Sequence, residues 1–269
     1  MIQFTNVSKQ FGDAEYALKD ISFEIADGEF VLITGPSGSG KTTLIRMLTR
    51  EYTPTSGDIL FDDESLVDLK KSKVHLHRRK LGVVFQDYKL LPELNVWENI
   101  ALALNIIGKS ESETETRVTD LLKLVNLVEK AYLFPSQLSG GEAQRVSIAR
   151  ALATGPSVIC ADEPTGNLDQ ETSLAIAKLL KKINQLGTTV LFATHDIGVL
   201  AALKDERHLF IKHGDLVEDR NNHRAQTKKS STTEEVVETK VDEKESKKSK
   251  FSLPFGKKKE QPSVEVENL

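Results

Sequence analysis

The residues best suited to chemistry begin with a glycine-rich stretch, "GPSGSGKTT", at residues 35–43. It fits the pattern G-x-x-x-x-G-K-[ST], which is typical of a loop that binds phosphate groups. The glycines let main-chain N–H groups close around an anion, Lys41 can reach the β and γ oxygens, and the Thr42 hydroxyl can ligate Mg²⁺. The candidate nucleotide-binding residues of this loop are Gly35, Pro36, Ser37, Gly38, Ser39, Gly40, Lys41, Thr42 and Thr43.

A second group of candidates follows the apolar run at residues 158–161, in "SVICADEPTGNLD". Ligands in open α/β sheets bind at the carboxyl ends of the strands, where Asp162 and Glu163 would lie. We expect Asp162 to support Mg²⁺ through a bound water and Glu163 to polarise the attacking water of a phosphoryl transfer. The alternative is that the acidic pair merely begins a turn. The nearby phosphate loop favours the catalytic interpretation.

Gln86 and His195 also follow apolar runs, "LGVVF" and "TVLFAT". We interpret Gln86 as a glutamine that faces the metal and His195 as a sensor of the γ-phosphate, with a satisfied loop histidine as the alternative for His195. Cys160, inside a predicted buried strand, is expected to be a small hydrophobic residue. The remaining histidines lack such a placement and are predicted to lie at the surface: His75, His77, His208, His213 and His223.

The stretch "LSGGEAQRVSIAR" at residues 138–150 places a serine and two glycines at the start of a predicted helix. Because the N-terminus of a helix attracts anions, Ser139, Gly140 and Gly141 form a second candidate phosphate site. The alternative is that Ser139 only caps the helix. A cap leaves the glycine pair unexplained, because glycine lowers helix stability.

The elements that position these residues alternate between strand and helix patterns. Four short, continuously apolar runs predict buried parallel strands, at residues 30–34, 81–85, 157–161 and 188–194. Three runs near the N-terminus predict an antiparallel region, at residues 1–9, 18–25 and 57–61. Apolar residues at helical spacing predict helices within residues 111–130 and 171–186. The predicted fold is an α/β P-loop NTPase core with a mostly parallel sheet, an N-terminal antiparallel β subdomain and a helical subdomain at about residues 87–150.

Composition and charge divide the chain of 269 residues into two parts. From Arg220 onward there are 12 Lys and Arg against 9 Asp and Glu, which gives a charge of +3. Because the net charge of the whole chain is −4, residues 1–219 carry a charge of −7. We predict a globular domain over 1–219 and a disordered charged tail over 220–269, because the tail lacks a sustained apolar period. The stretch "KKSKFSLPFGKKK" suits an anionic membrane surface, but a solvated linker is the alternative, because its neighbours are acidic.

The single cysteine and the N-terminal sequence, which has no signal peptide, indicate a reducing cytoplasm. The apolar windows fall short of the roughly 20 residues that cross a bilayer. A nucleic-acid binder would show a basic face, and residues 1–219 are acidic overall, so that we expect no nucleic-acid partner.

In order and spacing, the phosphate loop, Gln86, "LSGGEAQ", "ADEPTGNLD" and "THD" resemble the ATP-binding-cassette (ABC) ATPases over residues 1–219. The resemblance implies ATP and Mg²⁺ as ligands and a head-to-tail dimer of two copies. Ser139, Gly140 and Gly141 would then contact the γ-phosphate of ATP held by the other copy. The resemblance also implies that Phe11 stacks on adenine, with a core phenylalanine as the alternative, and that Asp169 couples the two sites.

Within this family, residues 83–104, 161–169 and 191–200 resemble the members that serve cell division. This resemblance implies a peripheral subunit at the cytoplasmic face of the cell membrane, in which the segment after Gln86 contacts an integral membrane protein. ATP-driven closure of the dimer would be conveyed through that partner to cell-wall hydrolysis. The alternative is the ATPase of a lipoprotein-release or efflux transporter. The chain lacks the long coiled-coil insertion of a repair ATPase and the second cassette of a translation factor, and a nucleotide kinase has no use for "LSGGEAQ".

Overall fold

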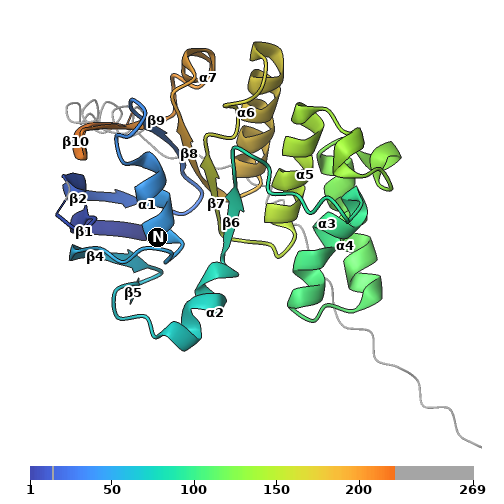
Figure 1. Cartoon of the computed structure of the whole chain (residues 1–269), viewed down its shortest axis with the longest axis horizontal. Helices are drawn as coiled ribbons and strands as arrows, with labels where there is room; N and C mark the ends of the chain where they lie inside the picture. Colours follow the sequence, from blue (N-terminus) through green and yellow to red (C-terminus); the bar gives the residue numbers. More distant parts are fainter. Residues whose placement is uncertain (14, 222–269) are drawn as a thin grey trace, which may run out of the picture.

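The computed structural model describes residues 1–13 and 15–221, which form two sheets and a group of helices (Figure 1). The larger sheet has six strands in the order β10-β9-β3-β8-β7-β6. Its strands are β3 (Phe30–Thr34), β6 (Leu81–Val84), β7 (Val158–Asp162), β8 (Thr189–Thr194), β9 (Arg207–Lys212) and β10 (Asp215–Arg220). The four predicted parallel strands are confirmed, and β9 joins them in parallel beside β3, while β10 is antiparallel to β9. Their shared direction brings the carboxyl ends of β3, β6, β7 and β8 to one edge.

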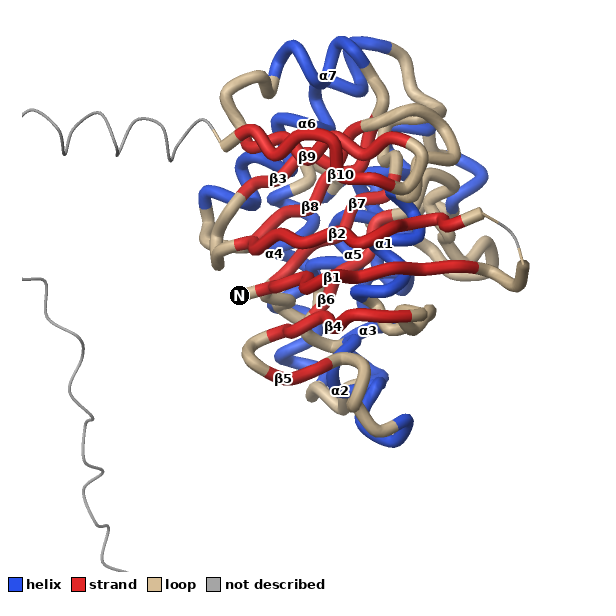
Figure 2. Tube along the Cα trace, turned by 90° about the vertical axis from the view of Figure 1, so that its left-hand side faces the viewer, coloured by secondary structure: helices blue, strands red, loops and turns tan. Residues whose placement is uncertain are grey.

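The smaller sheet is antiparallel and has the strand order β2-β1-β4-β5 (Figure 2). Its strands are β1 (Ile2–Gln10), β2 (Tyr16–Ile25), β4 (Ser56–Phe61) and β5 (Glu64–Ser65). Phe4 of β1 stacks on Phe23 of β2 with ring centroids 4.5 Å apart, and both side chains are buried. Helix α1 (Lys41–Leu48) packs between the two sheets, because Leu44 and Met47 belong to the same buried cluster as Phe4 and Ile33. The predicted antiparallel region is confirmed.

A group of helices lies beside the larger sheet, between β6 and β7 in the chain (Figure 1). It contains α3 (Val96–Ile106), α4 (Glu111–Leu124), the short 3-10 helices at Val128–Lys130 and Pro135–Gln137, and α5 (Gly140–Leu152). Each of the three α-helices begins with a capping box. The side chain of Asn95, Ser110 or Ser139 accepts the main-chain N–H of the glutamate three residues on, and that glutamate's carboxylate accepts the main-chain N–H of the cap residue. The helix predicted within residues 111–130 ends at Leu124. Further helices are α2 (Val74–Arg78), α6 (Gln170–Gln185) and α7 (Ile197–Ala202).

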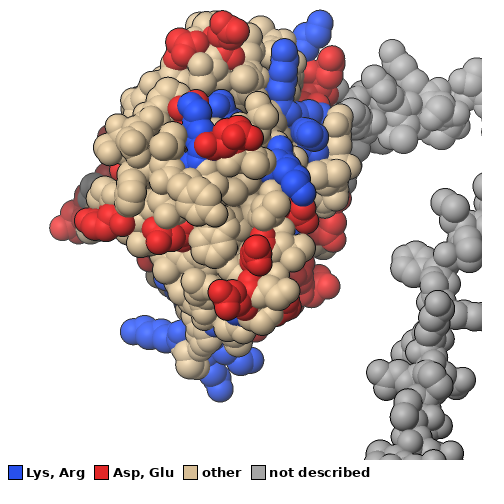
Figure 3. All heavy atoms as spheres, turned by 90° about the vertical axis from the view of Figure 1, so that its right-hand side faces the viewer, with Lys and Arg blue, Asp and Glu red and all other residues tan. Residues whose placement is uncertain are grey.

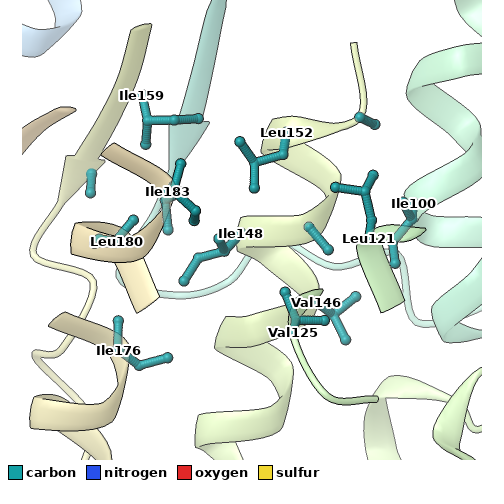
Figure 4. Close-up of a cluster of buried hydrophobic side chains, with 14 of the residues drawn as sticks. Ile100, Leu121, Val125, Val146, Ile148, Leu152, Ile159, Ile176, Leu180 and Ile183 are labelled. Atoms are coloured by element: carbon teal, nitrogen blue, oxygen red, sulfur yellow. The ribbon is translucent and has the colours of Figure 1, made fainter. Parts of the chain in front are cut away.

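Helix α5 lies at the centre of the second buried cluster and joins the helical group to the larger sheet. Figure 4 shows Ile148 on the side of Leu180 and Ile183 of α6, and Val146 on the side of Leu121. All five side chains are essentially inaccessible to solvent. Because α5 packs on both sides, a displacement of this helix must involve both the helical group and the core.

Two predictions about the periphery need correction. His77 is buried, not at the surface, because its Nε2 lies 2.7 Å from the Leu48 carbonyl oxygen and its ring packs edge-on against Phe61. The predicted domain boundary at residue 219 falls inside β10, which ends at Arg220. The rest of the predicted tail, together with His223, lies outside the described residues.

The face on the side of α3 and α4 carries acidic and basic side chains interspersed with uncharged surface (Figure 3). None of the helices in the described part of the chain has both the length and the hydropathy of a membrane-spanning segment.

Candidate active site

The phosphate loop connects β3 to α1 and takes a conformation that glycine permits. Gly35 and Gly40 have φ angles of 145° and 112°. A Cβ on Gly35 would lie 2.0 Å from the Ile211 carbonyl oxygen, and one on Gly40 would lie 2.4 Å from the Ala17 carbonyl oxygen. Both neighbours are main-chain atoms that cannot move aside, so the motif glycines are required by close packing as well as by their φ angles.

Lys41 stands at the start of α1 with its side chain only 5% exposed. Its Nζ donates to the carbonyl oxygens of Gly35 at 2.9 Å and Pro36 at 3.2 Å, and lies 3.3 Å from Glu163 Oε1. The buried charge is therefore balanced by a carboxylate and held inside the loop. The Ser39 hydroxyl is also buried, and among the described residues it has no hydrogen-bond partner. An unpaired buried hydroxyl is costly, so this loop fits an added anionic ligand.

The oxygens that suit a magnesium ion lie at the end of β7, in the first turn of α1 and just after β6. The Thr42 hydroxyl donates to Asp162 Oδ1 at 3.0 Å, and burial raises the pKa of Asp162 above its ordinary value. The described residues contain no group of three His, Cys, Asp or Glu that could hold a metal ion. Mg²⁺ commonly takes one or two protein oxygens and completes its shell with phosphates and water. A hydroxyl, a carboxylate and the amide oxygen of Gln86 fit that requirement.

Glu163 is held in an uncommon backbone conformation, with φ at 50°. Its N–H donates to the Ala193 carbonyl oxygen at 2.9 Å, which ties the turn after β7 to the end of β8. Both carboxylate oxygens lie 2.9 Å from Nδ1 of His195, a residue whose side chain is 64% exposed. Glu163 thus lies between the buried Lys41 and the exposed His195, where a carboxylate can accept a proton from water.

A pocket of about 420 Å³ brings most of these residues together. Its lining consists of Ala17, Ser37, Gly38, Ser39, Gly40, Lys41, Thr42, Thr43, Gln86, Glu163 and His195. Asp162 contacts this lining through Thr42, and Gly35 and Pro36 contact it through Lys41. The five remaining predicted site residues do not line the pocket: Phe11, Ser139, Gly140, Gly141 and Asp169.

Ser139 is exposed and caps α5. Its hydroxyl accepts the Glu142 N–H at 3.4 Å, and Glu142 accepts the Ser139 N–H at 3.0 Å. A 2.5 Å bond from Lys130 is the main reason that the pKa of Glu142 falls to about 2. The capping alternative for Ser139 is thereby supported within one chain.

The glycine pair of α5 also has a packing reason within the chain. A Cβ on Gly140 would lie 2.8 Å from the Tyr88 hydroxyl oxygen, and one on Gly141 would lie 2.4 Å from Cγ2 of Thr172. The start of α5 therefore packs closely on the loop after β6 and on the start of α6. Glycine at these positions admits neighbours on two sides.

Phe11 and Asp169 lie apart from the pocket. Phe11 is 42% exposed, so the alternative of a core phenylalanine is wrong, and its ring meets Tyr52 edge-on at 5.0 Å with Lys9 above it. Asp169 caps α6 by accepting the N–H of Thr172 at 3.0 Å and its hydroxyl at 2.6 Å.

The motifs did not single out two residues that support the site. The Asn167 side chain meets the side-chain amide and the carbonyl oxygen of Gln86, at 3.5 Å each. Asn167 stands inside "GNLD", so its motif was visible although its contact was not. Tyr88 carries no sequence signal beyond its place two residues after Gln86.

Comparisons with known proteins identify the family of this chain. Residues 18–166 match the ABC transporter family. The chain is 49% identical over 219 residues to the cell division ATP-binding protein FtsE of Bacillus subtilis strain 168, covering 81% of this chain and 96% of the relative. It is also 46% identical over 213 residues to the methionine import ATP-binding protein MetN 2 of Yersinia pestis, covering 78% of this chain and 65% of the relative.

Among solved structures, the fold is similar to a dimer of the ATP-binding cassette MJ0796 in a post-hydrolysis state with ADP and Pi. The TM-score is 0.75 at 40% identity, covering 83% of this chain and 99% of that one. The chain therefore belongs to the ABC transporter family and is an ABC-type ATPase.

Proposed function

We propose that this chain is the ATP-binding subunit of a cell-division complex and that it pairs with an FtsX-like integral membrane protein. The proposal is supported by the identity to the FtsE proteins of several bacteria, which the alignments cover at 90% or more of their length. In this complex ATP binding closes a dimer of two copies, and the membrane protein conveys the closure to cell-wall hydrolysis. The site of action is the cytoplasmic face of the membrane.

Within each pocket, the proposed roles follow from the contacts. Lys41 leaves its carbonyl partners to bind the β and γ oxygens of ATP, because phosphate offers a buried cation full opposite charge. Thr42, Asp162 and Gln86 would hold Mg²⁺, which when bound neutralises charge on the triphosphate. Glu163 accepts a proton from the attacking water. His195 orients the carboxylate through Nδ1 and presents its other ring nitrogen to the γ-phosphate.

The two copies are proposed to complete each other's sites. Ser139 and the glycine pair lie at the exposed start of α5 and do not line the pocket that holds Lys41. The similar cassette MJ0796 was solved as a dimer. ATP bound at one phosphate loop would thus be contacted by Ser139, Gly140 and Gly141 of the partner copy, with Phe11 against adenine and Asp169 between the two sites. ATP then favours the closed dimer by mass action.

A transporter ATPase is the second candidate function. The 46% identity to a methionine import ATP-binding protein shows how similar cassettes of transporters are to this chain. The alternative first raised from the sequence, a lipoprotein-release or efflux system, has the same pocket chemistry. The two functions differ in the membrane protein that binds the segment after Gln86.

The observation that carries the proposed hydrolytic roles is the position of Glu163 between Lys41 and His195, whereas the choice of the cell-division function is supported by the identity to the FtsE proteins. We expect Glu163→Gln to lower kcat by about 10²- to 10⁴-fold, because an amide cannot act as the base, while the protein still binds ATP. Steady-state ATPase assays and nucleotide-binding titrations measure the two quantities.

Glu206→Gln is the matched control. Glu206 also pairs with a lysine, Lys181 at 2.7 Å, but lies outside the pocket. It should leave kcat unchanged. Wild-type turnover by Glu163→Gln would contradict the assigned role.

A further inference from the structure

The loop that follows β6 contains two consecutive residues in the left-handed backbone region. Tyr88 and Lys89 have φ angles of 59° and 53°, although neither is a glycine. A residue other than glycine keeps this unfavourable backbone conformation only where contacts with the surrounding structure stabilise it. Gln86, which lines the pocket, lies only two residues earlier in the same loop.

Arg150 of α5 holds this left-handed pair. Its Nη1 donates to the Lys89 carbonyl oxygen at 2.7 Å, and its Nη2 donates to the Tyr88 carbonyl oxygen at 2.9 Å. Both bonds come from one planar guanidinium and are charge-assisted, so they fix the direction of two carbonyl groups at once. A lysine at this position has a single nitrogen and cannot reproduce that fork.

Two further contacts from α5 fasten the same loop. Gln144 Nε2 donates to the Phe85 carbonyl oxygen at 3.3 Å, and the Tyr88 hydroxyl packs over Gly140. The contacts therefore reach the loop both before and after Gln86. All of them come from the helix that begins at Ser139.

We propose that Arg150 is a positioning residue that makes the loop after β6 and helix α5 move as one unit. A displacement of this loop by a partner then also displaces Ser139 at the other end of α5. The position of the Gln86 side chain in the pocket likewise depends on Arg150. The inference rests on the proposed function, in which a membrane protein contacts this loop. Phe85, Gln86 and Asp87 are exposed and accessible to such a partner.

The test compares Arg150→Lys with Lys89→Ala. Lys89→Ala is the matched control. It removes the side chain of one residue of the left-handed pair but keeps the main-chain carbonyl that Arg150 binds. We expect Arg150→Lys to lower kcat of the isolated chain by about 10- to 100-fold, because Gln86 is misplaced, with little change in KM for ATP. The rates are expressed per bound nucleotide, so that a reduced folded fraction does not affect them.

The second arm uses the chain reconstituted with an FtsX-like membrane protein in lipid nanodiscs. The ratio of ATPase rates with and without the membrane protein should fall towards one for Arg150→Lys and stay at the wild-type value for Lys89→Ala. Wild-type kcat and a wild-type ratio for Arg150→Lys would overturn the inference. A wild-type chain that the membrane protein does not stimulate would count against the proposed function, and the kcat of the isolated chain would still test Arg150.

Hydrogen exchange of the wild-type chain provides a measurement that needs no variant. Adding a non-hydrolysable ATP analogue should change the protection of amides in segments 86–91 and 139–144 together. Independent responses of the two segments would overturn the inference even if Arg150→Lys failed to fold.

Discussion

Ser139 and Ser110 have nearly the same local structure at the starts of two helices. Each serine hydroxyl accepts the N–H three residues on, at 3.4 Å for Ser139 and 3.3 Å for Ser110. Each capping glutamate also accepts a bond from a lysine, which is the largest cause of its pKa of about 2. The caps are matched, but only Ser139 is proposed to contact ATP.

Replacing each serine with alanine separates capping from ATP contact. Ser139→Ala and Ser110→Ala should each lower the free energy of unfolding by about 1 kcal/mol, because each removes the same kind of cap. Only Ser139→Ala should also lower ATPase activity. Chemical denaturation and steady-state ATPase assays measure the two effects. Equal activity in the two variants would show that Ser139 is only a cap.

At the scale of residues, motifs predicted which side chains lie together wherever those residues are close along the chain. Lys41, Thr42 and Ser39 come from one loop, so their grouping follows from the pattern G-x-x-x-x-G-K-[ST]. The contact between Glu163 and His195 joins residues 32 positions apart. It was predictable only in outline, because both follow strands of one parallel sheet. The hydrogen bonds from Arg150 to two carbonyl groups could not be predicted from the sequence, since main-chain oxygens are present at every position.

The short helix α2 contacts the end of helix α1. His77 of α2 bonds to the carbonyl oxygen of Leu48, the last residue of α1, and packs against Phe61 of β4. Burial is the main cause that lowers the pKa of His77, with Lys80 and Arg78 acting in the same direction, while Glu64 and the Leu48 carbonyl oppose it. His77 is therefore neutral in the folded chain at neutral pH.

The burial of His77 predicts a dependence of stability on pH. The unfolded chain binds a proton at His77 below about pH 6.5, whereas the folded chain binds it only at a lower pH. The free energy of unfolding should therefore fall as pH drops from 6.5, by at most about 1.4 kcal/mol per pH unit from this group. His77→Gln keeps a donor for Leu48 and should flatten this slope. Equal slopes in urea titrations of the two proteins at pH 7 and pH 5.5 would contradict the assignment.

At the scale of elements, predictability followed the completeness of burial. Strands β3 and β8 are covered on both faces, and their continuous apolar runs predicted them. Strand β9 buries Arg207 through ion pairs with Glu29 and Asp219, so a charged residue stands where an apolar run would continue. The end of α4 at Leu124 was missed because Val125 and Leu127 continue the buried pattern after the helix stops.

In the whole molecule, the two segments that are proposed to bind anions lie on different parts of the fold. The phosphate loop joins β3 to α1, whose Leu44 and Met47 belong to the buried cluster that contains Phe4, whereas Ser139 caps α5, which belongs to the other buried cluster. One chain thus lines a pocket with Lys41 and Glu163 and presents Ser139 elsewhere. The central claim is that a second copy brings its Ser139 to that pocket when ATP is bound.

Thiol crosslinking between two differently substituted chains tests this claim most directly. Ser37→Cys and Ser139→Cys are introduced into separate Glu163→Gln chains, and buried Cys160, whose pKa is raised to about 12, stays unreactive. With ATP and Mg²⁺, a short crosslinker should join the mixed chains into a covalent dimer, and omission of ATP should prevent it. Crosslinking within a single chain that carries both substitutions, or no ATP-dependent product from the mixture, would contradict the shared site.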